Sequence, residues 1–214
     1  MKKILLFTIF YFLIISVTSA QITKGSVLIG SSIYVSSYEI EDGTTNTKQT
    51  FFAVSPSIGR AIVENMIIGV RLSYGHGENK YSSAPSQEEI TTYSAGLFLR
   101  NYFLLGRRFY LFGVTDAGFG RTERHQTSGI DYERNLKDFS IGSSFSPAIS
   151  YAVNRRFHLE AGLNSLLNIS YTTTKITTVS FTGVRRSKAH GFSLYANLSN
   201  PTPLTIGFQL LLTK

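Results

Sequence analysis

The stretch SPSIGRAIVENMIIGVRLSYGHG, residues 55–77, alternates apolar with small or polar side chains on both sides of a short turn at 63–65. After the turn, every second residue from Met66 to Tyr74 is apolar, while the opposite face carries glycines and a serine around Arg71. Successive side chains of a β-strand point to opposite faces, so the pattern predicts two strands, each with one apolar face. The role of the arginine on the other face depends on the rest of the chain.

The same period-two alternation recurs from end to end, and no long segment has helical periodicity. It predicts eight strands, at about 24–37, 49–62, 65–77, 90–104, 108–121, 137–153, 156–173 and 190–213. Within the last of them, the sequence Asn200-Pro201-Thr202-Pro203 predicts a bulge or bend, because proline cannot donate a hydrogen bond to a neighbouring strand.

The connections alternate between two kinds. Three are tight turns, at 63–65, 105–107 and 154–155. The other four are long and polar: YEIEDGTTNTK (38–48), ENKYSSAPSQEE (78–89), TERHQTSGIDYERN (122–135) and TKITTVSFTGVRRSK (174–188). All tight turns therefore fall at one end of the strands and all long loops at the other, which is typical of outer-membrane barrels. The predicted fold class is all-β: an eight-stranded antiparallel up-and-down transmembrane β-barrel.

A soluble calycin-like or jelly-roll barrel is the alternative, with its large side chains facing inward. The sixth predicted strand argues against it, because one face is large and apolar and the other is an unbroken series of Ser, Gly and Ala from Ser140 to Ala152. Small residues suit the narrow lumen of an eight-stranded barrel. Strands of a dozen or more residues also match a tilted membrane crossing better than a globular core.

The chain begins with two lysines, an apolar run from Ile4 to Val17 and small residues ending at Ala20. This pattern predicts a cleavable signal peptide at 1–20 and a single barrel domain at 21–214. The formal net charge is +8, and cysteine is absent, which excludes disulfides, a thiol nucleophile and thiolate metal sites. We expect no cofactor, no metal and, for an exported chain, no nucleic-acid partner.

At this point the sequence resembles the small eight-stranded outer-membrane β-barrel proteins of Bacteroidetes-type bacteria, akin in architecture to the OmpX and OmpW types. The resemblance rests on QITKGSVLIGSS at 21–32, on the hairpin SPSIGRAIVENMIIGV at 55–70 and on YLFGVTDAGFG at 110–120. It implies a porin-like protein of the cell envelope, inserted by the barrel assembly machinery.

Six polar residues share the parity of the lumen: Arg71, Arg100, Asp116, His158, Glu160 and Gln209. Charges enclosed in a narrow barrel need partners, so we interpret them as a lumen network in which Asp116 and Glu160 neutralise the two arginines. A gated polar path for small solutes is the functional alternative. His158 and Glu160 sit one residue apart, but the chain offers no third group for catalysis beside them, and we assign no catalytic residue.

A second group of basic residues lies on the long-loop side, in the predicted loops or directly beside them: Arg121, Arg124, Arg134, Arg185, Arg186 and Lys188. Guanidinium and ammonium groups pair well with phosphate, so these side chains are candidates for contact with lipopolysaccharide. Acidic residues such as Glu123 and Glu133 in the same loops favour the alternative of ordinary solvated charges.

Three functions remain open from the sequence. The first is a structural or surface-interaction protein of the outer membrane with a side-chain-filled lumen. The second is a narrow channel for small or hydrophobic solutes, as in OmpW-like barrels, and the third is a lipid-modifying barrel enzyme. We expect the first, with no enzymatic activity, as a monomer among outer-membrane lipids and lipopolysaccharide, with both termini in the periplasm.

Overall fold

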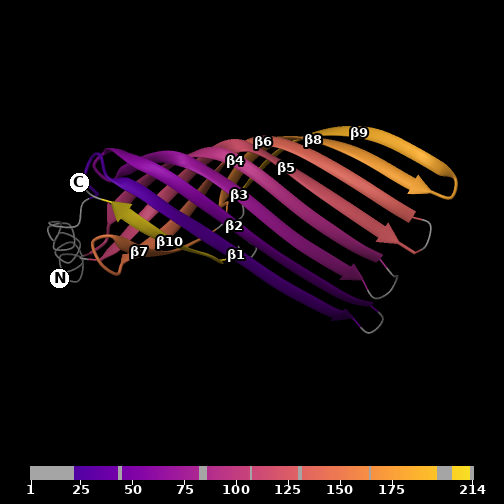
Figure 1. Ribbon diagram of the computed structural model, residues 1–214, viewed down its shortest axis with the longest axis horizontal. Coiled ribbons are helices and arrows are strands. Elements are labelled where there is room, and N and C mark those ends of the chain that lie inside the picture. The colour runs from indigo at the N-terminus through magenta and orange to yellow at the C-terminus, as the bar shows by residue number, and fades with distance from the viewer. Residues whose placement is uncertain are drawn as a thin grey trace, which may run out of the picture.

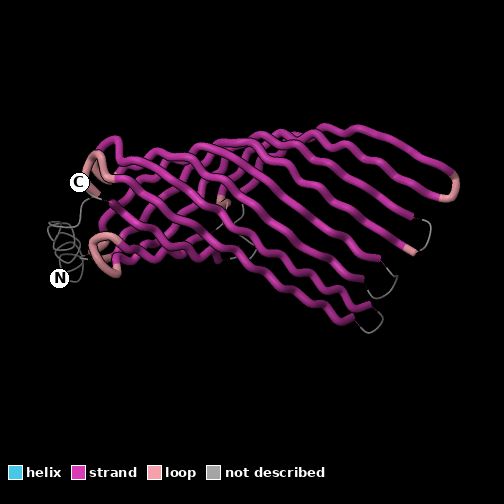
Figure 2. Tube along the Cα trace, in the orientation of Figure 1, coloured by secondary structure: helices cyan, strands magenta, loops and turns pink. Residues whose placement is uncertain are grey.

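The computed structural model describes residues 22–42, 45–81, 86–106, 108–129, 132–163, 165–196 and 204–212. These residues form ten antiparallel strand segments and no helix (Figures 1 and 2). The segments are β1 (Val27–Asp42), β2 (Thr45–Val63), β3 (Met66–Tyr81), β4 (Ser86–Leu104), β5 (Phe109–Ser128), β6 (Tyr132–Ala152), β7 (Phe157–Leu163), β8 (Leu167–Ser180), β9 (Gly183–Ala196) and β10 (Leu204–Leu212).

Eight of these segments close into a ring. Strands β1 to β6 pair in sequence order, β6 pairs with β7, β7 with β10, and β10 with β1. The remaining hairpin, β8–β9, continues the wall beyond β7, with β8 paired to the far part of β6 and β9 paired to β8. The predicted all-β antiparallel fold with a ring of eight strands is therefore confirmed.

The seventh and eighth predicted strands are each divided in two. Along β6, Ala148 lies opposite Gly162 and Phe145 lies opposite Leu167. The chain between β7 and β8 therefore contains more residues than the facing part of β6, and the extra residues have no paired partner on β6. Ser165 has a positive φ of 51°, and its backbone N–H donates to Ser146 Oγ at 3.0 Å. This bulge replaces the continuous strand expected at 156–173. The predicted bend at 200–203 and the predicted signal peptide lie outside the described residues.

The predicted long loops are mostly strand. β5 continues to Ser128 and β6 begins at Tyr132, while β8 and β9 leave only Phe181 and Thr182 between them. The expectation of long loops at 122–135 and 174–188 was therefore wrong, because these polar stretches prolong the barrel wall. The tight turns agree better with prediction. Glu64 and Asn65 join β2 to β3, and Asn65 has a positive φ of 60°, a conformation that asparagine adopts more readily than most residues.

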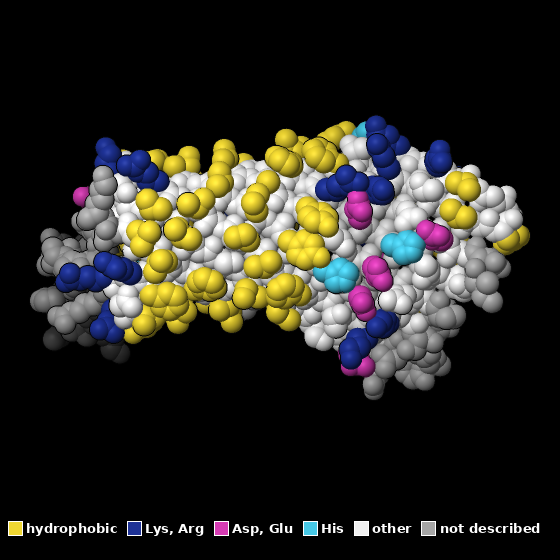
Figure 3. All heavy atoms as spheres, in the orientation of Figure 1, with side chains coloured by type: hydrophobic (Ala, Val, Ile, Leu, Met, Phe, Trp, Pro, Cys, Tyr) yellow, Lys and Arg dark blue, Asp and Glu magenta, His cyan; other side chains and the backbone are white. Residues whose placement is uncertain are grey.

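On strands such as β3 and β5 the two faces separate as predicted, whereas every residue of β9 is exposed. On β3 the outward side chains from Ile68 to Tyr74 are about half exposed, whereas the inward Ile67 is fully buried. Similar outward residues on the other strands form a continuous hydrophobic belt over the half of the wall nearer the tight turns, and charged residues follow beyond it (Figure 3). Among the described residues, no helix is long and apolar enough to cross a membrane.

The lumen at the tight-turn end is packed with apolar side chains. The buried cluster consists of Ile22, Leu28, Ala61, Ile67, Phe98, Tyr102, Tyr110, Phe112, Val114, Ala152 and Leu211. The chain before β1 covers this end. Ile22 N–H donates to the side-chain oxygen Oδ1 of Asn65, Asn65 N–H donates to the carbonyl of Ile22, and Gly25 N–H donates to the carbonyl of Ala61. We call this cluster the floor. It contributes most of the apolar burial inside the barrel.

Two glycines allow β2 and β3 to approach each other beside the floor. Gly59 lies opposite Gly69, and a Cβ on Gly69 would stand 2.5 Å from the ring of Phe98 and closer still to the carbonyl oxygen of Ile58. We expect Gly69→Ala to lower the free energy of unfolding by about 1–3 kcal/mol, the usual cost of overpacking. The change is measured by urea unfolding of the protein in lipid vesicles.

Gly120→Ala is the matched control, because a Cβ there would meet its nearest atoms at the ordinary contact distance of 3.4 Å. Equal stability of the two variants would contradict the close packing proposed at Gly69.

Candidate functional site

The lumen charges form two layers above the floor. In the deeper layer, Arg100 Nη1 lies 3.0 Å from both carboxylate oxygens of Glu160. Gln209 Nε2 donates to Glu160 at 2.9 Å, and the Tyr102 hydroxyl lies 3.4 Å from the same carboxylate. Both charged side chains are more than nine-tenths buried. The Glu160 carboxylate thus has three donors, as a buried charge requires, whereas Arg100 Nε and Gln209 Oε1 are buried without a hydrogen-bond partner.

The second layer is the ion pair between Arg71 and Asp116. Arg71 Nη1 donates to Asp116 Oδ1 at 2.6 Å, and each side chain is 23% exposed. The ring of Phe98 joins the two layers, because the guanidinium carbon of Arg71 lies 5.3 Å from its centroid and that of Arg100 lies 5.1 Å from it. Cationic groups are attracted to aromatic faces at such distances. The arginine of the opening hairpin is thus held at the top of a packed stack.

His158 has no hydrogen bond or ion pair with either carboxylate. Its ring is buried, stacks on Tyr110 at a centroid distance of 5.7 Å, and places Nδ1 3.3 Å from Ser150 Oγ. The structure therefore brings five of the six predicted lumen residues into two ion-pair layers and gives the sixth a separate contact. The ion pairs neutralise the charges and hold them in fixed positions.

Sequence reasoning missed the aromatic residues that complete this site. Tyr102 and Phe112 stack at 4.9 Å, and Phe112 also lies under the Arg100 guanidinium at 5.3 Å. The available signal was the fifth predicted strand, where the inward face from Tyr110 to Val114 is apolar as well as the outward face. Apolar residues on both faces indicate a filled lumen at that depth.

Above the ion pairs the lumen widens into a basin lined largely by hydroxyl groups. Two adjoining cavities, of about 330 and 500 Å³, are both lined by Arg71 and Asp116, and the smaller one reaches down to Arg100 and Glu160. Around the larger one stand residues such as Ser94, Ser144 and Thr172. Among the described residues, the lumen is therefore filled at the tight-turn end and contains cavities toward the other end, whereas the sequence suggested that it is filled throughout.

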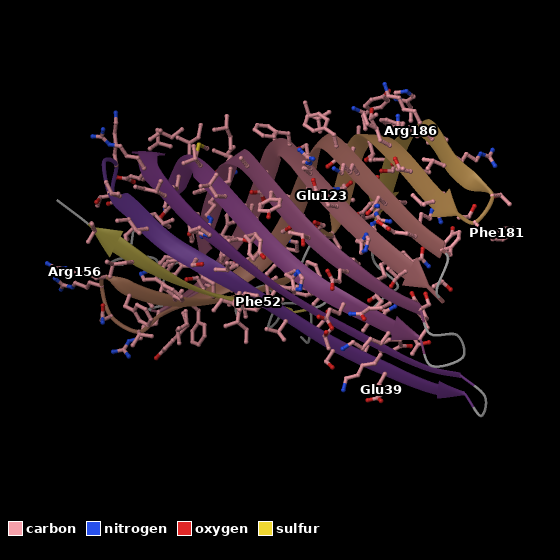
Figure 4. The ribbon with its side chains drawn as sticks, turned by 45° about the vertical axis from the view of Figure 1, so that its right-hand side comes forward. Glu39, Phe52, Glu123, Arg156, Phe181 and Arg186 are labelled. Carbon is pink, nitrogen blue, oxygen red and sulfur yellow. The ribbon has the colours of Figure 1, made fainter. Side chains whose placement is uncertain are left out.

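The six basic residues predicted in or beside the long loops all lie on strands, which corrects that prediction. Arg121, Arg186 and Lys188 have the outward parity of their strands, whereas Arg124, Arg134 and Arg185 have the inward parity. The side chain of Arg124 points inward as its parity indicates, because Arg124 Nη2 lies 2.9 Å from Oδ2 of the buried Asp138. Figure 4 shows Arg186 near the far end of the barrel, opposite the end that carries Arg156.

No metal centre is evident in the described part of the chain, where no three His, Cys, Asp or Glu side chains come close enough to hold an ion.

No protein-family model matches the sequence, and no curated protein matches it. The structure is similar to a major outer membrane protein of Thermus thermophilus, at 10% identity and a TM-score of 0.47, over 87% of this chain and 99% of that one. It is also similar to Neisserial surface protein A, at 18% identity and a TM-score of 0.37, over 90% and 97% of the two chains. A third similarity is to the translocator domain of the autotransporter NalP from Neisseria meningitidis, at 12% identity and a TM-score of 0.38, over 98% and 93%. Similarities of this size say nothing about function.

Proposed function

We propose that this protein is an integral outer-membrane β-barrel that acts as a sealed structural and surface-interaction protein rather than as a pore or an enzyme. The outward belt supports membrane insertion, because side chains such as Ile141 and Leu72 stay exposed on a closed ring of strands. The ring of eight strands satisfies its backbone hydrogen bonds internally, which is the condition for strands to cross lipid. Strand β9 pairs with β8 on one side and has no second partner among the described strands. The strands are also long enough to continue beyond the belt.

The floor is the observation that carries the sealed state. Ile67 and Phe98 are essentially inaccessible to solvent, and the Arg100–Glu160 pair closes the lumen directly above them. Of the two cavities, the deeper ends at these charged residues, and its lining does not include Ile67. A solute that enters the basin from the wide end therefore meets packed side chains before it reaches the tight turns.

The orientation rests on the strand extensions beyond the hydrophobic belt, which lie at the end opposite the tight turns. In outer-membrane barrels the tight turns lie in the periplasm and the long extensions lie outside. The proposal therefore places the floor and the N- and C-termini of the barrel domain on the periplasmic side. The hairpin tips at the opposite end of the barrel then lie outside the cell. Phe181, at the tip of β8–β9, is 88% exposed and would be part of that external surface (Figure 4).

Conductance in a planar lipid bilayer tests the sealed state. We expect no steady ion current through the wild-type barrel, and none through Arg71→Ala, because the floor beneath Arg71 remains intact. A steady current that changes in Arg71→Ala would show a continuous lumen and would favour the narrow-channel alternative. Unchanged lipid A and phospholipid profiles after deletion and overexpression are expected, since the proposal assigns no catalytic role.

A further inference from the structure

A row of three lysines crosses the outer wall beyond the hydrophobic belt. Lys137 on β6 lies directly opposite Lys175 on β8, and Lys175 lies directly opposite Lys188 on β9. Residues directly opposite on paired antiparallel strands point to the same face. The three share the outward parity of Phe139, and all are exposed. We call them the lysine row.

The lysine row is not neutralised by the protein. Like charges directly opposite each other destabilise a sheet, and here two such contacts follow one another. Glu123 stands opposite Lys137 on the other side, but its carboxylate pairs with Arg121 at 2.5 Å. Within the described ranges, no ion pair joins any of the three lysines to an acid. The lysine row is therefore a cluster of positive charge that a bound anion from outside the protein could neutralise.

The position of the row selects the anion. Two residues from Lys175 and Lys188 toward the hydrophobic belt, Thr173 lies opposite His190. Two residues farther in the same direction, Tyr171 lies opposite Phe192. Tyr171 Oη contacts His190 Nδ1 at 3.0 Å, which marks a polar–apolar boundary on the wall. Figure 3 shows Lys and Arg side chains gathered just past this end of the hydrophobic belt. Each step of two residues is about 7 Å of strand, so the ammonium groups stand at the height of lipid headgroups.

We infer that the lysine row binds the phosphate groups of lipid A, with the acyl chains of that lipid lying on the apolar wall around Tyr171 and Phe192. The inference rests on the proposed function, because only an outer-membrane barrel meets this lipid. Several ammonium groups at one height fit a headgroup that carries more than one phosphate. Arg186, two residues farther along β9 from Lys188 and also outward, extends the positive surface.

A matched control stands on the opposite part of the wall. Lys48 and Lys80 also face each other across two strands, but Lys48 lies opposite Glu39 and Lys80 pairs with Glu78 at 3.0 Å. The double variants Lys175→Gln/Lys188→Gln and Lys48→Gln/Lys80→Gln remove the same charge from two sites, only one of which lacks acidic partners.

The experiment measures binding of purified, detergent-refolded protein to lipid A by native mass spectrometry. We expect Lys175→Gln/Lys188→Gln to weaken binding of diphosphorylated lipid A by roughly tenfold or more, and the control variant to leave it unchanged. Dephosphorylated lipid A should bind the wild type as weakly as the row variant. Inorganic phosphate should not displace the lipid at equal concentration.

The inference is overturned if the two double variants bind lipid A equally well, if dephosphorylated lipid A binds like the phosphorylated form, or if free phosphate competes at equal concentration. Thermal unfolding in neutral detergent gives a second readout, in which the row variant should be at least as stable as the wild type because like-charge contacts are removed. Heat-modifiable gel migration after insertion into vesicles tests the proposed function separately. A barrel that inserts but does not prefer phosphorylated lipid A refutes only the lysine row.

Discussion

Glu160→Leu is expected to lower the free energy of unfolding by about 3–5 kcal/mol, the usual loss when one partner of a buried ion pair is removed. Arg100 would keep its charge at a site with almost no access to water, between the rings of Phe98 and Phe112. Gln209 would also lose its acceptor, since its amide donates to Glu160 at 2.9 Å. Urea unfolding in lipid vesicles, followed by far-ultraviolet circular dichroism, measures the loss.

The double variant Arg100→Met/Glu160→Leu separates the lost ion pair from lost packing. Replacing a whole buried pair by apolar side chains is often neutral or stabilising, so the double variant should recover most of the stability. Asp116→Asn gives a second comparison. Arg71 and Asp116 are each 23% exposed, so water can solvate the guanidinium of Arg71 when the carboxylate is lost. We expect its effect to be much smaller. A double variant as unstable as Glu160→Leu would contradict an electrostatic origin.

The faces of the strands could be predicted from the sequence because the signal is local. Successive side chains of a strand point to opposite faces, so Ile67 and Ile68 lie on different faces whichever strand pairs with them. A membrane barrel keeps this alternation along each strand that crosses the membrane. Parity alone therefore placed Arg71, Asp116 and Glu160 inside the lumen. Their depth and pairing depend on the stagger of strands far apart in the chain, and no local pattern carries that information.

The length of the strands beyond the belt was underestimated for a physical reason. Past the membrane both faces of a strand meet water, so the apolar alternation disappears and polar residues occupy both parities. The stretch from Thr174 to Lys188 therefore has the composition of a loop, although its threonines, valines and isoleucine favour extended backbone. The lysine row was hidden by the same error, because Lys175 and Lys188 become neighbours only when the hairpin is paired.

Phe98→Ala is the second change with a large expected effect. The ring is 1% exposed, and it fills the space beside Gly59 and Gly69 that larger residues on β2 and β3 would otherwise occupy. Removing it should cost about 3–5 kcal/mol of unfolding free energy, the usual range for a buried phenylalanine. Part of this loss comes from the guanidinium groups of Arg71 and Arg100, which lie over the same ring and would lose their contact with it.

Leu97→Ala is the control for Phe98→Ala, because Leu97 is the adjacent residue of β4 and faces outward with 58% of its surface exposed. In lipid vesicles the side chain of Leu97 contacts lipid rather than other protein side chains. Its truncation should therefore lower the free energy of unfolding by only a small fraction of the loss at Phe98. Phe98→Leu should fall between the two, since it fills part of the volume but offers no aromatic face to the arginines. Equal losses at 97 and 98 would mean that the floor contributes no more to stability than the lipid-facing wall does, and the sealed lumen would then lack the packing that closes it.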